Sequence, residues 1–183
     1  MTTLATLIRP HPATAPAIGA TGRDWMSYGQ LRGLAGSVRS ALRSAGVGAQ
    51  DRVAIVLPNG PEMAAAFVTV AQSATTAPLN PAYKEEEFAF YLEDLKARAI
   101  IVEAGYDGPA RAAANRFGLA VIELTAVEPA GMFTLSAPDA EDAPDTEPAA
   151  DDIALILHTS GTTSRPKIVP LLQSNVAASA ENI

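Results

Sequence analysis

Short apolar runs alternate with helical stretches along most of this 183-residue chain, and this alternation constrains its fold more than any other feature. The expected strands are residues 52–57, 74–79, 99–102 and 119–122, separated by helical patterns at 63–71, 84–96 and 109–117. Helices that link successive strands of one sheet make parallel crossovers, so the pattern predicts an α/β fold with a mainly parallel sheet and helices on both faces. With 48% apolar residues, we expect residues 1–183 to form a single domain.

The region before the first of these strands predicts a hairpin and a long helix. Residues 17–28 alternate apolar and polar side chains around Thr21 and Gly22, which is typical of a short hairpin. Ser27, followed three residues later by Gln30, makes a capping box at a helix start. The apolar face of that helix is formed by Leu31, Leu34, Val38 and Leu42.

The net charge of −7 has a local origin in the stretch 128–152. This stretch is rich in alanine, proline and acidic residues. Its part from Ser136 to Asp152 has no lysine or arginine and holds seven acids, Asp139, Glu141, Asp142, Asp145, Glu147, Asp151 and Asp152. The other thirteen acidic residues balance the thirteen lysines and arginines. Because large apolar side chains are few here, we expect residues 128–152 to run over the surface as a solvated loop.

Composition excludes several classes of function. Without a basic stripe, and with an isoelectric point near 4.8, the chain is not a nucleic-acid binder. No stretch approaches the roughly twenty apolar residues of a spanning helix, and no signal-peptide core is visible, which favours a cytoplasmic protein. The absence of cysteine excludes disulfides and thiolate chemistry, and two distant histidines make a zinc site unsupported, so we expect no metal ligand in this chain.

The chemistry-bearing segment follows the apolar run 153–157, which we expect to be a strand. Thr159, Ser160, Thr162 and Thr163 surround Gly161, and Lys167 stands six residues after the glycine. Hydroxyl groups, a glycine that lets an anion reach backbone N–H groups, and a nearby cation together indicate a phosphate-binding loop. Residues 171–183 have helical spacing, so we expect the loop to lie between a strand and a helix N-terminus that favours anions.

The P-loop of nucleotide triphosphatases is the obvious competitor for this segment. Gly161 and Lys167 have the offset of its Gly-x4-Gly-Lys-Ser/Thr pattern. Pro166 occupies the second glycine position, and Ile168 occupies the position of the hydroxyl that binds magnesium. Since both the backbone wrap and the metal ligand are missing, we reject this interpretation.

The segment instead resembles the phosphate loop of adenylate-forming enzymes, the superfamily of acyl-CoA synthetases, adenylation domains and luciferases. That pattern is roughly [Ser/Thr]-Ser-Gly-Thr-Thr-Gly-x-Pro-Lys-Gly, and it is matched by Thr159, Ser160, Gly161, Thr162, Thr163, Pro166 and Lys167. Ser164 and Ile168 depart from it, because the superfamily usually has glycine at both positions. The run 164–169, Ser-Arg-Pro-Lys-Ile-Val, is similar to the variant in oxalate-CoA ligase-like and fatty-acid-CoA ligase-like members.

Upstream segments extend the resemblance over most of the chain. Residues 26–31, 51–59 and 77–83 are similar to the superfamily's Leu-Thr-Tyr-x-Glu-Leu, Asp-Arg-Val and Val-Pro-Leu-Asn-Pro-x-Tyr elements. Members are much longer than this chain, and Ile183 falls inside an expected helix without a capping signal. We therefore expect residues 1–183 to be the N-terminal subdomain of a larger ligase, inactive by itself.

The resemblance implies a reaction and a set of roles. The parent enzyme would use ATP and Mg2+ to convert a carboxylic acid into an acyl adenylate with release of pyrophosphate, and would then pass the acyl group to coenzyme A. Thr159, Ser160, Thr162 and Thr163 would donate hydroxyl hydrogen bonds to the phosphates, and Gly161 would give access to the backbone. Lys167 would supply a mobile positive charge and is the candidate catalytic residue.

Other interpretations stay open at this point. His158 could contact nucleotide or pack beside the sheet, and Arg165 could pair with phosphate or point to solvent. The chain could also be a short, non-catalytic module that binds nucleotide or a partner. Apolar surface left exposed could drive self-association. Neither the carboxylic acid nor the thiol acceptor can be read from these residues.

Overall fold

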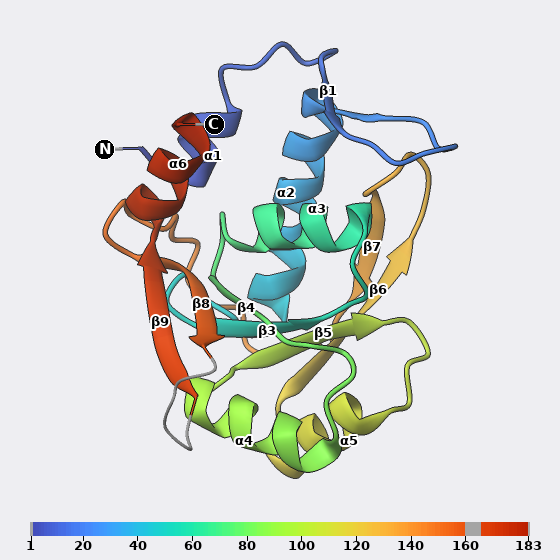
Figure 1. The fold of residues 1–183 in the computed structure, drawn as a ribbon, viewed down its shortest axis with the longest axis vertical. Helices are drawn as coiled ribbons and strands as arrows, with labels where there is room; N and C mark the ends of the chain where they lie inside the picture. The colour runs from blue at the N-terminus through green and yellow to red at the C-terminus, as the bar shows by residue number, and fades with distance from the viewer. Residues whose placement is uncertain (1, 160–165, 183) are drawn as a thin grey trace.

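A computed structural model of the chain describes residues 2–159 and 166–182. Within these residues a seven-stranded sheet dominates the fold, with the strand order β7-β6-β5-β3-β4-β8-β9 (Figure 1). The parallel strands are β3 (Arg52–Val56), β4 (Thr75–Pro78), β5 (Ala99–Glu103), β6 (Ala120–Ala126) and β8 (Ile153–Thr159). The edge strands β7 (Phe133–Ser136) and β9 (Lys167–Leu172) run antiparallel to their neighbours. The predicted mainly parallel α/β sheet is therefore confirmed.

Helices cover both faces of this sheet, as the sequence predicted. On one face lie α2 (Tyr28–Ser44) and α3 (Pro61–Val70), and on the other lie α4 (Glu85–Leu95) and α5 (Pro109–Arg116) (Figure 1). Strand β3 shows how its sequence serves both layers: Val53 and Ile55 join the core beneath α2 and α3, whereas Ala54 and Val56 join the core beneath α4 and α5. No helix among those described has the length and apolar character that crossing a bilayer requires.

Helix α2 begins where its capping box predicts. The Ser27 side chain accepts a hydrogen bond from the Gln30 amide at 3.2 Å, and the Gln30 side chain accepts one from the Ser27 amide at 2.9 Å. The hairpin expected before this helix is present as β1 (Pro16–Ile18) and β2 (Met26–Ser27). All four predicted inner residues of α2, Leu31, Leu34, Val38 and Leu42, are buried.

The two ends of the chain meet on one side of the molecule, where α1 (Leu4–Ile8) packs beside α6 (Gln173–Glu181) (Figure 1). Helix α1 carries too short a pattern to be expected from the sequence. The buried Gln173 side chain joins three elements, because it accepts a hydrogen bond from the Leu4 amide at 3.2 Å and donates one to the Ala71 carbonyl at 2.5 Å. This polar bridge fixes the start of α6 against α1 and the end of α3.

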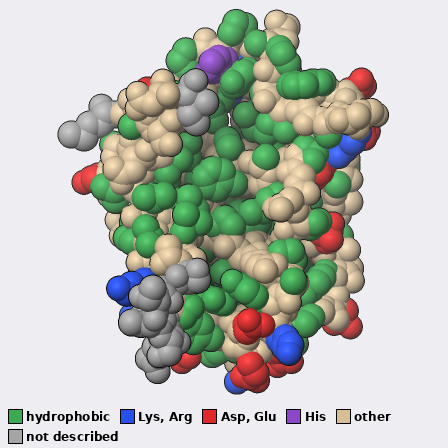
Figure 2. All heavy atoms as spheres, in the orientation of Figure 1, with side chains coloured by type: hydrophobic (Ala, Val, Ile, Leu, Met, Phe, Trp, Pro, Cys, Tyr) green, Lys and Arg blue, Asp and Glu red, His purple; other side chains and the backbone are tan. Residues whose placement is uncertain are grey.

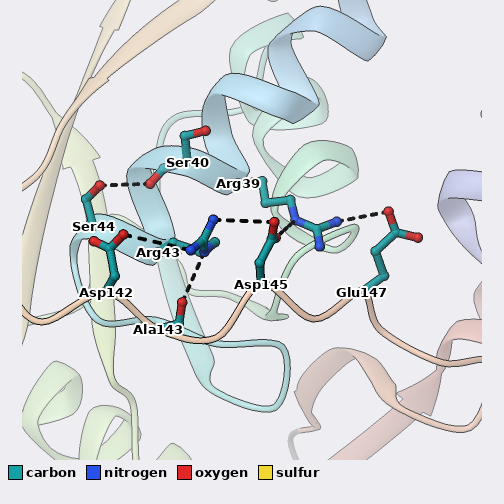
Figure 3. A network of polar contacts seen from close by, with 8 residues as sticks. All are labelled: Arg39, Ser40, Arg43, Ser44, Asp142, Ala143, Asp145 and Glu147. Carbon is teal, nitrogen blue, oxygen red and sulfur yellow. Dashed lines mark hydrogen bonds and ion pairs between the residues drawn. The ribbon is translucent and has the colours of Figure 1, made fainter.

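The stretch 128–152, expected as a solvated loop, contains the edge strand β7, and ion pairs hold its acidic portion to α2. We call residues 139–152 the acidic segment. Arg39 of α2 contacts Asp145 at 2.7 Å and Glu147 at 3.0 Å (Figure 3). Arg43, one turn later, contacts Asp145 at 3.4 Å and donates a hydrogen bond to the Ala143 carbonyl at 3.0 Å. The negative charge of this segment thus fastens it to a helix.

Candidate phosphate-binding site

The two strands that border the predicted phosphate loop form an antiparallel hairpin. Strands β8 and β9 pair in a register that places Thr159 opposite Lys167 and His158 opposite Ile168. Residues directly opposite one another in an antiparallel pair have side chains on the same face, with Cβ atoms about 4.5–5.5 Å apart. The structure therefore brings Thr159 and Lys167 together, and both are exposed.

Ser160, Gly161, Thr162 and Thr163 lie outside the described residues, as does Arg165. Their proposed contacts with phosphate stay predictions. What the structure adds is the position of the first and last members of the motif, Thr159 and Lys167, at neighbouring strand ends.

The expectation that the loop leads to a helix N-terminus that favours anions is wrong, because a strand comes between them. Lys167 begins β9, and α6 begins only at Gln173, after the six residues of that strand. At about 3.3 Å per residue, the start of α6 is roughly 20 Å along the chain from Lys167. Because partial charge at a helix end acts over about one turn, the N-terminus of α6 does not contribute to anion binding at Lys167. Side chains and local backbone must supply that binding.

His158 packs beside the sheet, which was one of the two interpretations left open. Its side chain is only 6% exposed, and its Nε2 atom lies 3.2 Å from the Asp94 carboxylate of α4. Its ring makes an edge contact with Tyr91 of the same helix, with 4.6 Å between centroids. The sequence did not identify Tyr91 and Asp94 as contacts of His158. Their spacing of three residues places them on one face of α4, but nothing local indicates their partner.

An aromatic pair supports this contact. The Tyr83 and Tyr91 rings stack with centroids 4.9 Å apart. Hydrogen bonding with Tyr83, together with burial, raises the pKa of Tyr91 to about 12. Tyr91 therefore stays neutral at physiological pH and serves as packing and hydrogen-bonding surface rather than as an acid or base.

Ile168, which departs from the superfamily glycine, fits the observed backbone. It lies inside β9, opposite His158, and its side chain packs against the apolar cluster that contains Phe88 and Leu92 of α4. Lys96 is the only non-glycine residue with positive φ among those described, so Ile168 needs none of the freedom of glycine. The substitution adds packing at the hairpin.

A cavity of about 230 Å³ lies elsewhere, between α1, α2 and the acidic segment. Its charged lining consists of Arg9, Arg32, Arg39 and Glu147. Neither Thr159 nor Lys167, the two predicted site residues that the structure describes, lines it. Within residues 2–159 and 166–182, no group of three or more histidines or acids is arranged to hold a metal ion.

The chain belongs to the AMP-binding enzyme family, whose pattern matches residues 7–183, and this confirms the superfamily predicted from the loop. It is 38% identical to an oxalate–CoA ligase of Arabidopsis thaliana over 173 residues, which cover 91% of this chain and 34% of that protein. A second relative, oxalate–CoA ligase of Saccharomyces cerevisiae, is 39% identical over 160 residues, covering 73% and 30%. The chain thus spans about a third of the length of these relatives.

Solved structures agree with the observed fold. The ATP-bound structure of MatB from Rhodopseudomonas palustris superposes with a TM-score of 0.76 and 26% identity, covering 99% of this chain and 37% of that one. The seven-stranded sheet with its covering helices is therefore the N-terminal part of the fold of an adenylate-forming enzyme.

Proposed function

We propose that this chain is the N-terminal part of an ATP-dependent carboxylate–CoA ligase, with the segment from Thr159 to Lys167 holding the triphosphate of ATP. The observation that carries the proposal is the pairing of Thr159 with Lys167 at the end of the β8–β9 hairpin. This pairing places a hydroxyl group and a primary ammonium group side by side at the two ends of a motif shared with the family. Similarity to two oxalate–CoA ligases supports the reaction class.

The proposed first step joins a carboxylate oxygen to the α-phosphorus of ATP and breaks the bond to the β-phosphate oxygen, releasing pyrophosphate. Negative charge grows on the leaving oxygens during this step. Donors already in position lower its barrier, and preorganised electrostatics commonly supply the largest part of rate enhancement. The hydroxyls of Thr159, Ser160, Thr162 and Thr163 and the ammonium of Lys167 are a donor set that suits a polyphosphate.

In the second proposed step the coenzyme A thiol replaces AMP at the acyl carbon. We assign no coenzyme A or Mg2+ ligand to these residues. ATP is the substrate that the residues of this chain would bind, through its phosphates.

A cytoplasmic location, and self-association through apolar surface such as Leu157, which is 40% exposed, stay predictions. Apolar side chains cover much of the face of the molecule in Figure 2.

Replacing Lys167 by alanine in the intact ligase tests the proposal. We expect ATP–pyrophosphate exchange to fall on the order of 100-fold, because one positive charge would be lost from the developing pyrophosphate. Oxalate, the acid named for two relatives, is the first substrate to assay, beside a panel of other carboxylic acids.

Lys84→Ala is the matched control. Lys84 is also an exposed lysine, but it lies at the start of α4. His158, which directly precedes Thr159, contacts Asp94 near the other end of this helix. Its exchange rate should match that of the unmodified enzyme. An unchanged rate in Lys167→Ala would remove the loop from the reaction and refute the proposed function.

A further inference from the structure

Both strands that border the phosphate loop rest on α4. The pair next to Thr159 and Lys167 in the hairpin is His158 and Ile168. His158 contacts Asp94 and Tyr91 of α4, and Ile168 joins the cluster that contains the buried helix residues Phe88 and Leu92. Figure 1 shows α4 beside the end of β8 and the start of β9. The helix therefore supports the two strands at the residues next to Thr159 and Lys167.

The support itself is firmly held. Phe88, Leu92 and Leu95 fix α4 in the core, with exposed fractions of 0%, 2% and 0%. Tyr91 is stacked on Tyr83. Movement of α4 would break these contacts, so the Asp94 carboxylate is a fixed reference point for whatever binds to it.

His158 links Thr159 to this fixed carboxylate. It is covalently adjacent to Thr159, and its side chain is almost fully enclosed, whereas the Asp94 side chain is 39% exposed. The contact between Nε2 and the carboxylate therefore orients β8 at its last residues. Catalytic groups must be held within roughly 0.5 Å of their productive positions, so a contact one residue away from a phosphate ligand affects binding.

We infer that His158 is a positioning residue for ATP, holding Thr159 through its contact with Asp94. This inference rests on the proposed function. A different role for the same ring is simple core filling, in which the shape of the side chain matters but its hydrogen bond does not. The two roles predict different kinetics.

The test uses the intact ligase and the KM for ATP in pyrophosphate exchange. His158→Phe keeps a flat ring against Tyr91 but cannot bond to Asp94, and we expect it to raise this KM about tenfold, the effect of losing one hydrogen bond to a charged group. His158→Gln keeps an N–H donor and should retain most of the affinity. Loss of correctly folded protein alone would lower the apparent kcat and leave KM unchanged.

Asp94→Ala removes the partner and should raise KM as His158→Phe does. Because the two residues act through one contact, the double variant should be no worse than either single variant. Glu93→Ala, which changes an exposed acid next to Asp94, is the control and should leave KM unchanged. Asp94→Ala also carries the test if His158→Phe does not fold, since the Asp94 side chain is the more exposed partner.

The outcomes separate this inference from the proposed function. A normal KM in both His158→Phe and Asp94→Ala, with exchange lost in Lys167→Ala, would overturn the positioning role and leave the proposed function standing. Effects of His158→Phe and Asp94→Ala that multiply in the double variant would also overturn it. Unimpaired exchange in Lys167→Ala would overturn the proposed function, and the inference with it.

Discussion

Gly131 precedes β7 in a backbone conformation that other residues rarely adopt, with φ of 83°. A methyl group there would lie 3.0 Å from Ile18 Cγ2 and 3.1 Å from the Pro61 carbonyl oxygen. We expect Gly131→Ala to lower the free energy of unfolding by about 2–4 kcal/mol, combining backbone strain with overpacking. Urea denaturation measures this change.

Gly22→Ala is the control for backbone strain alone. Gly22 has φ of 76° and no atom within 4 Å of the added methyl group. Its substitution should cost only about 1–2 kcal/mol. Equal losses for the two variants would show that the contacts around Gly131 relax without cost.

Tyr91 makes the free energy of unfolding depend on pH in the alkaline range. Its folded-state pKa is raised from 10.0 to about 12, chiefly by hydrogen bonding with Tyr83, so folding favours the neutral phenol. This contribution is fully present below pH 10 and is lost as pH rises toward about 12. We expect Tyr91→Phe to make stability less dependent on pH in this window.

Chemical denaturation at a series of pH values measures this effect, and the ultraviolet absorbance of tyrosinate follows ionisation directly. Tyr28→Phe, outside the Tyr83–Tyr91 pair, is the control and should keep the steeper pH dependence. If Tyr91→Phe and the unmodified chain lose stability in parallel between pH 10 and 12, Tyr91 is not the responsible group.

At the scale of elements, the acidic segment is attached to α2 by two arginines one turn apart. The acids that pair with Arg39 are more than half exposed, so these contacts are strongly screened by salt. We expect Arg39→Gln to lower the free energy of unfolding by about 1 kcal/mol in low salt and by less than half of that at high ionic strength. Thermal or urea denaturation at two salt concentrations measures both values.

Arg32→Gln is the matched control on the same helix. Arg32 donates a hydrogen bond to the backbone carbonyl oxygen of His11 at 3.0 Å. This acceptor carries no net charge, so the effect of losing Arg32 should change little with salt. If both variants respond to salt alike, the ion pairs of Figure 3 contribute nothing specific to stability.

The edge elements also show the limits of local patterns. Phe133–Ser136 and Lys167–Leu172 are short, and Pro170 interrupts the second, so neither stood out as a strand. Each is completed by pairing with a neighbour, β6 or β8. Pro170 is tolerated because β9 is an edge strand, where a missing N–H need not break a ladder.

At the scale of the whole molecule, we expect the 183-residue chain by itself to give no ATP–pyrophosphate exchange. Its proposed site residues would bind only the phosphates of ATP, and the chain spans about a third of the length of its relatives. An exchange assay on the purified chain checks this. Exchange above buffer level that disappears in Lys167→Ala would show that the chain is active alone and contradict the prediction.

The sequence by itself determined the alternation of strands and helices, the family, and the motif between Thr159 and Lys167. These follow from local information: apolar periodicity, capping residues such as Ser27 and Gln30, and residue types at fixed spacing. Each depends on neighbours within a few positions along the chain.

Only the tertiary structure decided how distant parts meet. It turned the segment after the loop into β9, brought Asp94 to His158 across 64 positions, and joined Arg39 to Asp145 across 106. Such contacts depend on strand order and on how helices pack over the sheet. Many partners of the right chemistry exist along the chain, and the packing of helices and loops on the two faces of the sheet selects among them.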